Sequence, residues 1–293
     1  MHIIVGGTGQ VGSAVAKTLL VQGQEVAVIT REISKGAQLQ AAGASVLAID
    51  IRDVAALRAA FQTGKRAFLL NPSASPAGDM EAEERASIAA IAQALEGSGL
   101  EKVVATSTYG AHSGQHCGDL TVLHEFEQIL KAQPIPCVIN RGGYYMSNWT
   151  GAGMIEAVCR TGKLPSFLPA DLPIPMVAPR DLGIVAAQRM MEPLDNTKLQ
   201  YVEGPQSYSA QDVANAYAEV LKTPVEVAVI PPDGWTSAYL QLGFSEVSAE
   251  SFANMTRKLV DGLCEPGDVP VRGQTPLAEF ITKAVKNAGK SNL

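Results

Sequence analysis

Gly6-Gly7-Thr8-Gly9-Gln10-Val11-Gly12 is the stretch that decides the fold. It follows a short apolar run at residues 2–5 and leads into apolar residues at helical spacing, including Val15 and Leu19. The glycines permit a tight turn, close approach of a pyrophosphate to the backbone, and close packing of helix on strand. The N-terminus of the helix adds free N–H groups and a partial positive charge. The alternative is a tight turn that binds nothing. The expected contacts of a dinucleotide are Gly6, Thr8, Gly9, Gln10, Val11 and Gly12.

Length and charge narrow the class of protein. The chain has 293 residues, enough for one large or two modest domains, and its 46% hydrophobic content is ordinary for a globular protein. A net charge of −6 argues against nucleic acid or an anionic membrane as the main partner, because both favour a basic surface. We find no apolar run of about 20 residues and no signal peptide before the first strand, so we expect a cytoplasmic protein.

The cysteines and histidines do not indicate a metal site. The cysteines are scattered and form no CxxC, at Cys117, Cys137, Cys159 and Cys264. His112 and His116 would share a helix face, but the glycines around them indicate a loop. We therefore expect no metal, and we interpret the loop with His112, His116 and Cys117 as a mobile neighbour of the substrate pocket.

The N-terminal half alternates apolar runs with helical patterns. The expected strands are 2–5, 25–29, 45–49, 66–70, 102–106 and 136–140. The expected helices are 10–22, 34–42, 53–62, 79–97 and 120–132. The strands are rich in Val, Ile and Leu, which is typical of strands buried on both faces. Repeated units of this kind predict a parallel sheet with helices on both faces and ligands beyond the carboxyl ends of the strands.

The regular alternation stops near residue 145. Five prolines between residues 163 and 179 predict a loop or an extended excursion. A helix is then expected from Arg180, with Asp181 as its N-cap, and Ser209 and Asp212 have the spacing of a capping box. Further strands are expected at 198–203 and 225–230, and further helices near 232–242, 248–263 and 276–288.

Several segments together resemble the NmrA-like branch of the atypical short-chain dehydrogenase/reductase superfamily. The glycine stretch matches its glycine motif, Thr30-Arg31 matches the segment after its second strand, and Asp50-Ile51-Arg52-Asp53 matches its DxxD after the third. Glu125-Phe126-Glu127 followed by residues 136–148 matches a further segment, and residues 204–212 resemble its C-terminal entry. The chain is most similar to the type-2 NAD(P)H:quinone oxidoreductases within this family.

The resemblance implies a two-part α/β architecture. One part is a Rossmann-type, doubly wound parallel sheet that binds NAD(P), formed by residues 1–148 with 176–204 returning to it. The other is a smaller, discontinuous α/β substrate domain, formed by residues 149–175 and 205–293. It also implies a small-molecule partner and a chain that is a monomer or a homodimer.

The end of the second strand bears on the choice of cofactor. Arg31 follows the strand, with no acidic residue immediately before it, and Lys35 adds a second positive charge. A guanidinium suits the 2′-phosphate of NADP, whereas NAD usually requires an acid there. We therefore favour NADP(H) and keep NAD(H) as the alternative. The resemblance places Asp50 and Ile51 at the adenine, while Asp53 is expected to cap the next helix.

Residues after the fourth, fifth and sixth strands complete the predicted site. Sheet topology places Asn71, Pro72 and Ser73 beside the ribose and diphosphate, and Thr106 and Ser107 near the nicotinamide. Tyr144 is expected to stack on the nicotinamide and is a candidate catalytic residue, with core packing as the alternative. The expected substrate contacts are Tyr109, Tyr145 and Asn148.

One catalytic pattern is absent. Many short-chain reductases use a Tyr with a Lys four residues later, because the Lys lowers the pKa of the Tyr. No tyrosine here has a Lys at that position. His124 is a candidate proton donor in its place, and the alternative is a half-exposed helical His near Glu127 or Gln128.

Two functions fit these features. The first is an NADPH-dependent oxidoreductase that transfers hydride to a quinone-like or other conjugated acceptor, which needs little acid catalysis. The second is a redox sensor that binds NADP(H) without turnover and responds through a change in conformation. A pocket of substrate size beyond the nicotinamide would favour the enzyme.

Overall fold

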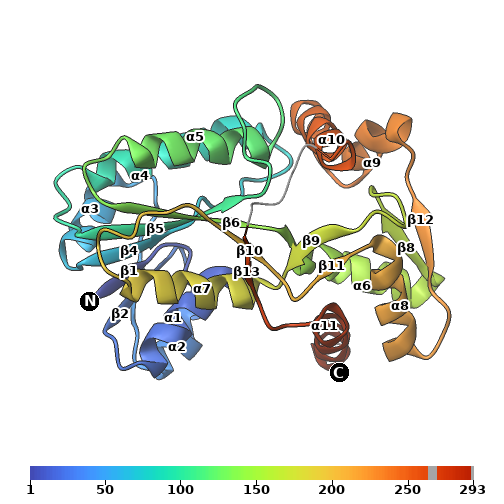
Figure 1. Cartoon of the computed structure of the whole chain (residues 1–293), viewed down its shortest axis with the longest axis horizontal. Helices are drawn as coiled ribbons and strands as arrows, with labels where there is room; N and C mark the ends of the chain where they lie inside the picture. The colour runs from blue at the N-terminus through green and yellow to red at the C-terminus, as the bar shows by residue number, and fades with distance from the viewer. Residues whose placement is uncertain (263–268, 292–293) are drawn as a thin grey trace.

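An eight-stranded parallel sheet forms the centre of the molecule (Figure 1). The structure is a computed structural model that describes residues 1–262 and 269–291, so Cys264 lies outside the described residues. The strand order is β13-β10-β6-β5-β4-β1-β2-β3. The strands are β1 (His2–Ile4), β2 (Val26–Thr30), β3 (Ser45–Ala48), β4 (Arg66–Leu69), β5 (Lys102–Thr108), β6 (Cys137–Gly142), β10 (Gln200–Glu203) and β13 (Val271–Arg272).

Helices cover both faces of this sheet, so the predicted Rossmann-type doubly wound fold is confirmed. Figure 1 shows α3, α4 and α5 over one face and α1, α2 and α7 under the other. The bounds are α1 (Gln10–Val21), α2 (Ala37–Ala41), α3 (Val54–Gln62), α4 (Met80–Leu95), α5 (Asp119–Lys131) and α7 (Pro179–Met191). A 3-10 turn, Ile33–Gly36, precedes α2.

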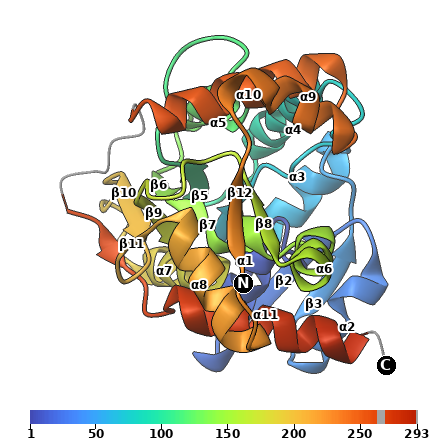
Figure 2. The same cartoon turned by 90° about the vertical axis from the view of Figure 1, so that its right-hand side faces the viewer.

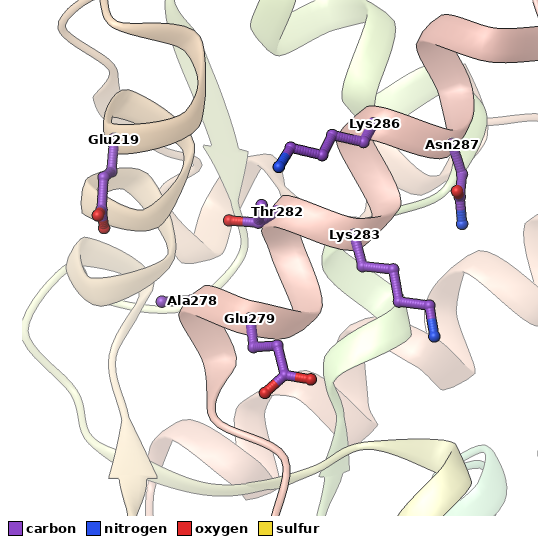
Figure 3. Close-up of a pocket in the computed structure, with 7 residues that line it drawn as sticks. All are labelled: Glu219, Ala278, Glu279, Thr282, Lys283, Lys286 and Asn287. Atoms are coloured by element: carbon purple, nitrogen blue, oxygen red, sulfur yellow. The ribbon is translucent and has the colours of Figure 1, made fainter.

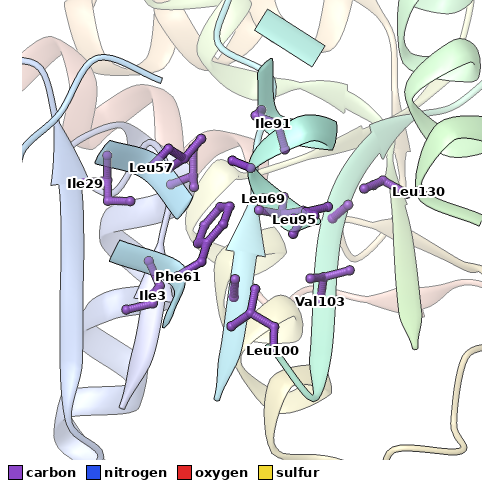
Figure 4. Packing of buried hydrophobic residues seen from close by; sticks show 14 of the residues in the cluster. Ile3, Ile29, Leu57, Phe61, Leu69, Ile91, Leu95, Leu100, Val103 and Leu130 are labelled. Carbon is purple, nitrogen blue, oxygen red and sulfur yellow. The ribbon is translucent and has the colours of Figure 1, made fainter. Parts of the chain in front are cut away.

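Alternation along each strand builds two cores. Successive residues of a strand point to opposite faces, so Ile3 packs with Leu57 and Phe61 on one side. Ile4 packs with Val15 and other apolar side chains on the opposite side. Figure 4 shows the first of these cores between the sheet and the helices above it. The expected burial on both faces is wrong for β3, whose ends are exposed because it is an edge strand.

The rest of the chain forms smaller sheets and helices beside the carboxyl edge of the large sheet. Two small sheets have the orders β11-β9-β7 and β12-β8, so the proline-rich stretch holds two short strands, β8 and β9. Figure 2 views this part of the molecule from its own side. The strands are β7 (Tyr144–Tyr145), β8 (Lys163–Ser166), β9 (Ile174–Val177), β11 (Ser207–Tyr208) and β12 (Glu226–Val229). The helices are α6 (Ala152–Thr161), α8 (Ala210–Leu221), α9 (Trp235–Gln241), α10 (Glu246–Val260) and α11 (Leu277–Ser291), with 3-10 turns at Met146–Trp149 and Pro232–Gly234.

Of the two helix N-caps predicted in the later part of the chain, one is confirmed and one is wrong. The capping box of Ser209 and Asp212 is confirmed at the start of α8, with both reciprocal hydrogen bonds formed. The predicted N-cap at Asp181 is wrong, because α7 begins at Pro179 and Ala178 is its N-cap. The Asp181 carboxylate instead accepts hydrogen bonds from the backbone N–H and the hydroxyl of Thr275, at 2.8 and 2.9 Å.

The chain returns twice to the large sheet. β10 pairs with β6, and β13 pairs with β10, although the expected division did not place residues 271–272 in this sheet. Helix α7 lies against α1, where Gly183 leaves no room for a Cβ beside Ala14. Within the described residues, no helix is both long and apolar enough to cross a bilayer.

Candidate functional site

The glycine loop follows β1 and forms a tight cradle at the carboxyl edge of the sheet. Gly6 has φ +66°, and the N–H of Gly9 donates to its carbonyl at 3.0 Å. A Cβ on Gly12 would lie 2.8 Å from the Gly7 Cα, so the helix packs closely against the turn. The first N–H groups of α1 have no intrahelical partner and point out of the helix end. Gly9 and Gln10 are exposed there, so this end is open to an anion.

The end of β2 meets this loop and carries the expected basic residues. The hydroxyl groups of Thr8 and Thr30 lie 3.2 Å apart, which ties the glycine loop to β2. Arg31 is exposed and forms no ion pair within the described chain. Lys35 forms an exposed ion pair with Glu32 at 2.9 Å, so its charge is partly neutralised. Arg31 is therefore the cation of this segment that is free to bind a phosphate.

The two acidic residues after β3 differ in role. The Asp53 side chain accepts from the N–H of Ala56 at 3.0 Å, so the expected cap of α3 is confirmed. Asp50 is exposed and accepts from the N–H of Arg52 at 2.9 Å, which closes a short turn. Ile51 follows in this turn and is half-buried.

Two buried polar side chains near the ends of β4 and β5 lack hydrogen-bond partners. Asn71 is 9% exposed and Thr106 is 3% exposed, and neither the Asn71 Oδ1 nor the Thr106 Oγ1 has a partner in the described structure. Buried polar atoms are nearly always hydrogen-bonded, and an exception calls for a ligand or another explanation. Pro72 is half-buried and Ser73 is exposed in the same loop. The pair suits a bound polar molecule at this edge.

Ser107 is committed to a buried ion pair. Its hydroxyl donates to Glu127 of α5 at 2.7 Å, and Arg141 of β6 donates to both oxygens of the same carboxylate at 2.7 and 2.9 Å. Burial raises the pKa of Glu127, but the hydrogen bonds from Arg141 and Ser107 outweigh it and hold the pKa below its ordinary value. A cofactor at Ser107 would therefore meet its backbone.

Tyr109 belongs to a second network across β10 and β13. It is buried and donates to Glu203 at 2.6 Å, and Glu203 pairs with Arg272 at 3.1 Å. Its ring packs edge-on against Tyr201 at 5.0 Å, and the Tyr201 hydroxyl accepts from Arg141 at 3.3 Å. Burial and the Glu203 carboxylate raise the pKa of Tyr109. The Tyr109 side chain therefore links the end of β5 to β10, and its hydroxyl already donates its hydrogen bond to Glu203.

The two tyrosines of β7 follow the end of β6. Tyr144 packs against Trp149 with ring centroids 5.9 Å apart, and Asn148 is an exposed neighbour of its hydroxyl. Tyr145 is half-buried, and the nearby charge of Asp119 adds to the rise in its pKa. Burial raises the pKa of both phenols, so both stay protonated at neutral pH. They offer neutral hydroxyl groups to a ligand.

His124 lies on a different side of α5 from the core. Val122 and Phe126 belong to the core under this helix, and a residue two positions away is about 200° further round an α-helix. The His124 Nε2 lies 3.5 Å from the Gln128 amide, as in the alternative interpretation. Its Nδ1 is buried without a partner in the described structure.

The loop with His112, His116 and Cys117 connects β5 to α5. The His112 Nδ1 lies 2.7 Å from the Gly110 carbonyl, His116 is exposed, and Cys117 is a buried free thiol. Among the described residues, no three His, Cys, Asp or Glu side chains are grouped so as to hold a metal ion.

An acidic group at the start of α4 and α5 did not emerge from the sequence. Glu81, Glu84 and Asp119 are neighbours, and burial together with the nearby acids raises the pKa of Glu84 to about 8 and of Asp119 to about 6. Asp119 is the first residue of α5 and Glu84 is in the second turn of α4. The only sign of this group in the sequence is that two helices near the predicted site carry carboxylates. The sequence does not show that these helices are neighbours.

Two surface cavities lie elsewhere. One of about 420 Å³ lies between α8 and α11, where Thr282 and Lys286 approach Glu219 (Figure 3). Another of about 400 Å³ lies near the start of β10, beside Arg189 and Tyr201. Neither is lined by the glycine loop, so the site is defined by its residues at the sheet edge.

Known proteins share this architecture. The chain is 24% identical over 252 residues to an NAD(P)H azoreductase from Xenophilus azovorans, covering 86% of this chain and 84% of that protein. The Citrobacter sp. triphenylmethane reductase complexed with NADP(H) superposes with a TM-score of 0.81 at 18% identity, covering 97% of this chain and all of that one.

A third relative is similar to this chain over almost its whole length. The NADPH-dependent quinone oxidoreductase from Escherichia coli, in complex with NADPH, superposes with a TM-score of 0.79 at 21% identity, covering 97% of this chain and 99% of that chain. These likenesses show a common fold. The family model for the NmrA-like family matches residues 2–262, most of the chain, and the protein therefore belongs to the NmrA-like family.

Proposed function

We propose that this protein is an NAD(P)H-dependent oxidoreductase that favours NADPH and reduces a quinone-like or other conjugated small molecule. The observation that carries the proposal is the cradle at residues 6–12 beside the unpaired Arg31. The relatives named for azo, triphenylmethane and quinone substrates support the reaction class. The azo, triphenylmethane and quinone groups in these names are all conjugated.

The residues present fit the proposed cofactor. The open N–H groups at Gln10 and Val11 suit the diphosphate, and Arg31 suits a 2′-phosphate because its planar guanidinium donates paired hydrogen bonds. Asp50 has a free carboxylate oxygen for the adenine amino group. The unpartnered Asn71 and Thr106 suit the ribose and the carboxamide end. When bound, the dihydronicotinamide supplies the hydride.

The protein's own part is to orient the acceptor and exclude water from it. We infer that residues 149–175, 205–262 and 277–291 form the acceptor-binding part, because they lie beyond the carboxyl edge of the large sheet, whereas β13 belongs to the sheet itself. Tyr144, Tyr145 and Asn148 enter this part directly after β6. When the cofactor supplies the chemistry, the protein raises the reaction rate by binding and orienting the reactants.

The test is consumption of NADPH and NADH by the purified protein with a panel of quinones and azo dyes, alongside calorimetric binding of both cofactors. We expect turnover with NADPH in preference to NADH. Tight NADPH binding without turnover of any acceptor would reject the enzyme and favour the alternative function, a redox sensor. No binding of either cofactor would overturn the proposal.

A further inference from the structure

Three carboxyl groups gather where α4 and α5 begin. Both helices start at the carboxyl edge of the sheet, after β4 and β5 respectively. The N–H of His112 donates to the carbonyl of Leu120 at 3.1 Å, which brings the start of α5 back beside the end of β5. Asp119 therefore lies at the edge where the proposed cofactor and acceptor meet.

Glu81 is the member of the group with a cation and hydrogen-bond donors around it. It pairs with Arg85 at 3.0 Å and accepts from the N–H of Gly118 at 3.0 Å. The hydroxyl of Ser251, on α10, also donates to it. These donors are the partners that a buried carboxylate requires, and they fix the Glu81 side chain beside the other two acids.

Glu84 is buried and forms no ion pair in the described structure. It is 4% exposed, and its hydrogen bond in the described structure is one accepted from the N–H of Ala74 at 3.1 Å. Burial and the neighbouring acids raise the pKa of Glu84 to about 8, so it is protonated at neutral pH. Ala74 belongs to the loop that begins with Asn71, so Glu84 holds the loop that carries one of the unpartnered polar groups.

Asp119 is half-buried and its carboxyl group is free. It forms no hydrogen bond or ion pair within the described chain. Burial and the charge of Glu81 raise the pKa of Asp119 to about 6. The other charged and titratable groups around it are Glu84 and Arg85 on α4, Tyr145 on β7, and Lys258 on α10 near Cys117.

A second observation shows that this edge is built for a ligand. Asn71 and Thr106 are more than nine-tenths buried and have unpartnered polar atoms in the described structure. They lie at the ends of neighbouring strands, and loops 70–79 and 109–118 connect β4 and β5 to α4 and α5. Buried polar groups without partners point to a ligand at this edge of the sheet.

We propose that Asp119 is the proton donor of the reductase site. The inference rests on the proposed function. As hydride adds to the acceptor with two electrons, the O–H bond of the Asp119 carboxyl breaks and a new bond forms from that proton to the acceptor oxygen or nitrogen. Asp119 is left as a carboxylate and regains its proton from solvent. Burial and the neighbouring Glu81 carboxylate favour the protonated form of Asp119.

Asp119 suits this role better than the other candidates. The phenols of Tyr144 and Tyr145 hold their protons too tightly at neutral pH, because burial raises their pKa. A general acid works best when its pKa lies near the working pH. His124 is directed away from the core side of α5, and Asp119 begins the helix at the sheet edge.

The first test is the pH profile of kcat/KM for the acceptor in the wild type and in Asp119→Asn. In the wild type we expect the rate to fall as pH rises above about 6, because the acid must be protonated. In Asp119→Asn, kcat/KM at low pH should fall by about 100-fold, the lower end of the range for general acid catalysis, because a conjugated acceptor needs little acid catalysis. The variant should also lose this pH dependence, with an unchanged Kd for NADPH. Asp119→Glu should restore part of the rate, and the exposed Asp233→Asn is the matched control.

The second test needs no turnover. NMR titration of ¹³C-labelled aspartate carboxyls in the protein without cofactor should show a signal with a midpoint near pH 6 that disappears in Asp119→Asn. A midpoint near 4 for Asp119 overturns the proposal. An active wild type whose Asp119→Asn variant keeps rate and pH profile overturns the acid role alone. A wild type that turns over no acceptor overturns the proposed function and the acid role with it.

Discussion

Gly12 shows how one residue determines whether the cofactor loop forms. A Cβ at this position would lie 2.8 Å from the Gly7 Cα and closer still to the Gly6 carbonyl oxygen. Both neighbours are backbone atoms of the turn, so they cannot move aside without changing the loop. The third glycine of the motif is therefore required by packing, and we propose that it serves cofactor binding through that packing.

We expect Gly12→Ala to lower the free energy of unfolding by about 1–3 kcal/mol and to weaken NADPH binding, because the loop must shift. Urea denaturation and calorimetry measure the two effects. Gly153→Ala is the control, since a Cβ there meets nothing within 4 Å. Equal stability and NADPH affinity in Gly12→Ala and the wild type would contradict the packing argument.

Arg31 is the residue on which we propose that cofactor choice depends. Removing hydrogen bonds to a charged group costs about 1.5–3 kcal/mol, so Arg31→Ala should weaken NADPH binding by about 10- to 100-fold. NADH binding should hardly change, and calorimetry with both cofactors measures the difference. Lys35→Ala should have a smaller effect, because Lys35 is already paired with Glu32. An equal loss for NADPH and NADH in Arg31→Ala would contradict a 2′-phosphate contact.

Helix α8 is the element whose start the sequence defines most completely. The Ser209 hydroxyl accepts from the N–H of Asp212 at 3.2 Å, and the Asp212 carboxylate accepts from the N–H of Ser209 at 2.8 Å. Both partners are within four residues of each other, so no distant part of the fold is needed to form the cap.

Ser209→Ala should lower the free energy of unfolding by about 1 kcal/mol, the usual cost of losing an N-cap. Urea denaturation measures it, with Ser237→Ala in the exposed part of α9 as the control. A loss no greater than that of the control would show that the cap contributes nothing to stability.

Other elements depended on neighbours that the sequence does not reveal. The apolar content of β3 is similar to that of the central strands, but β3 lies at the edge of the sheet and is partly exposed. Asp181 has the residue type of an N-cap, yet its carboxylate binds Thr275, which is 94 residues away. Local patterns identify such elements, whereas their burial and their partners follow from the sheet order.

At the scale of the whole molecule, the start of α10 connects the C-terminal part of the chain to the loop that follows β4. The hydroxyl groups of Ser245 and Ser248 donate to the Gly78 carbonyl at 2.7 and 2.8 Å, and the N–H of Met80 donates to Ser248 at 3.1 Å. Ser251 adds its contact with Glu81. The C-terminal helices thereby hold the loop that follows β4 and help to bury Glu84.

The buried Glu84 makes stability depend on pH in a defined direction. Its pKa is raised from 4.5 to about 8 in the folded protein, so between these values the folded state keeps a proton that the unfolded state loses. The free energy of unfolding should therefore fall as pH rises from about 4.5 to 8. Glu84→Gln should remove this contribution, and urea denaturation across that range measures it. An identical pH dependence in the wild type and Glu84→Gln would show that Glu84 is not buried in its neutral form.

The sequence by itself determined the Rossmann-type fold, the glycine cradle and the family, because these depend on short-range patterns: a strand, a turn with required glycines, and a helix. It also placed Arg31 at the end of β2. Only the tertiary structure decided that Asp119 meets Glu81 and Glu84, that Ser107 is committed to Glu127, and that β13 joins the large sheet. These features depend on which helices and strands become neighbours, and burial among those neighbours then sets the charge state of each acid.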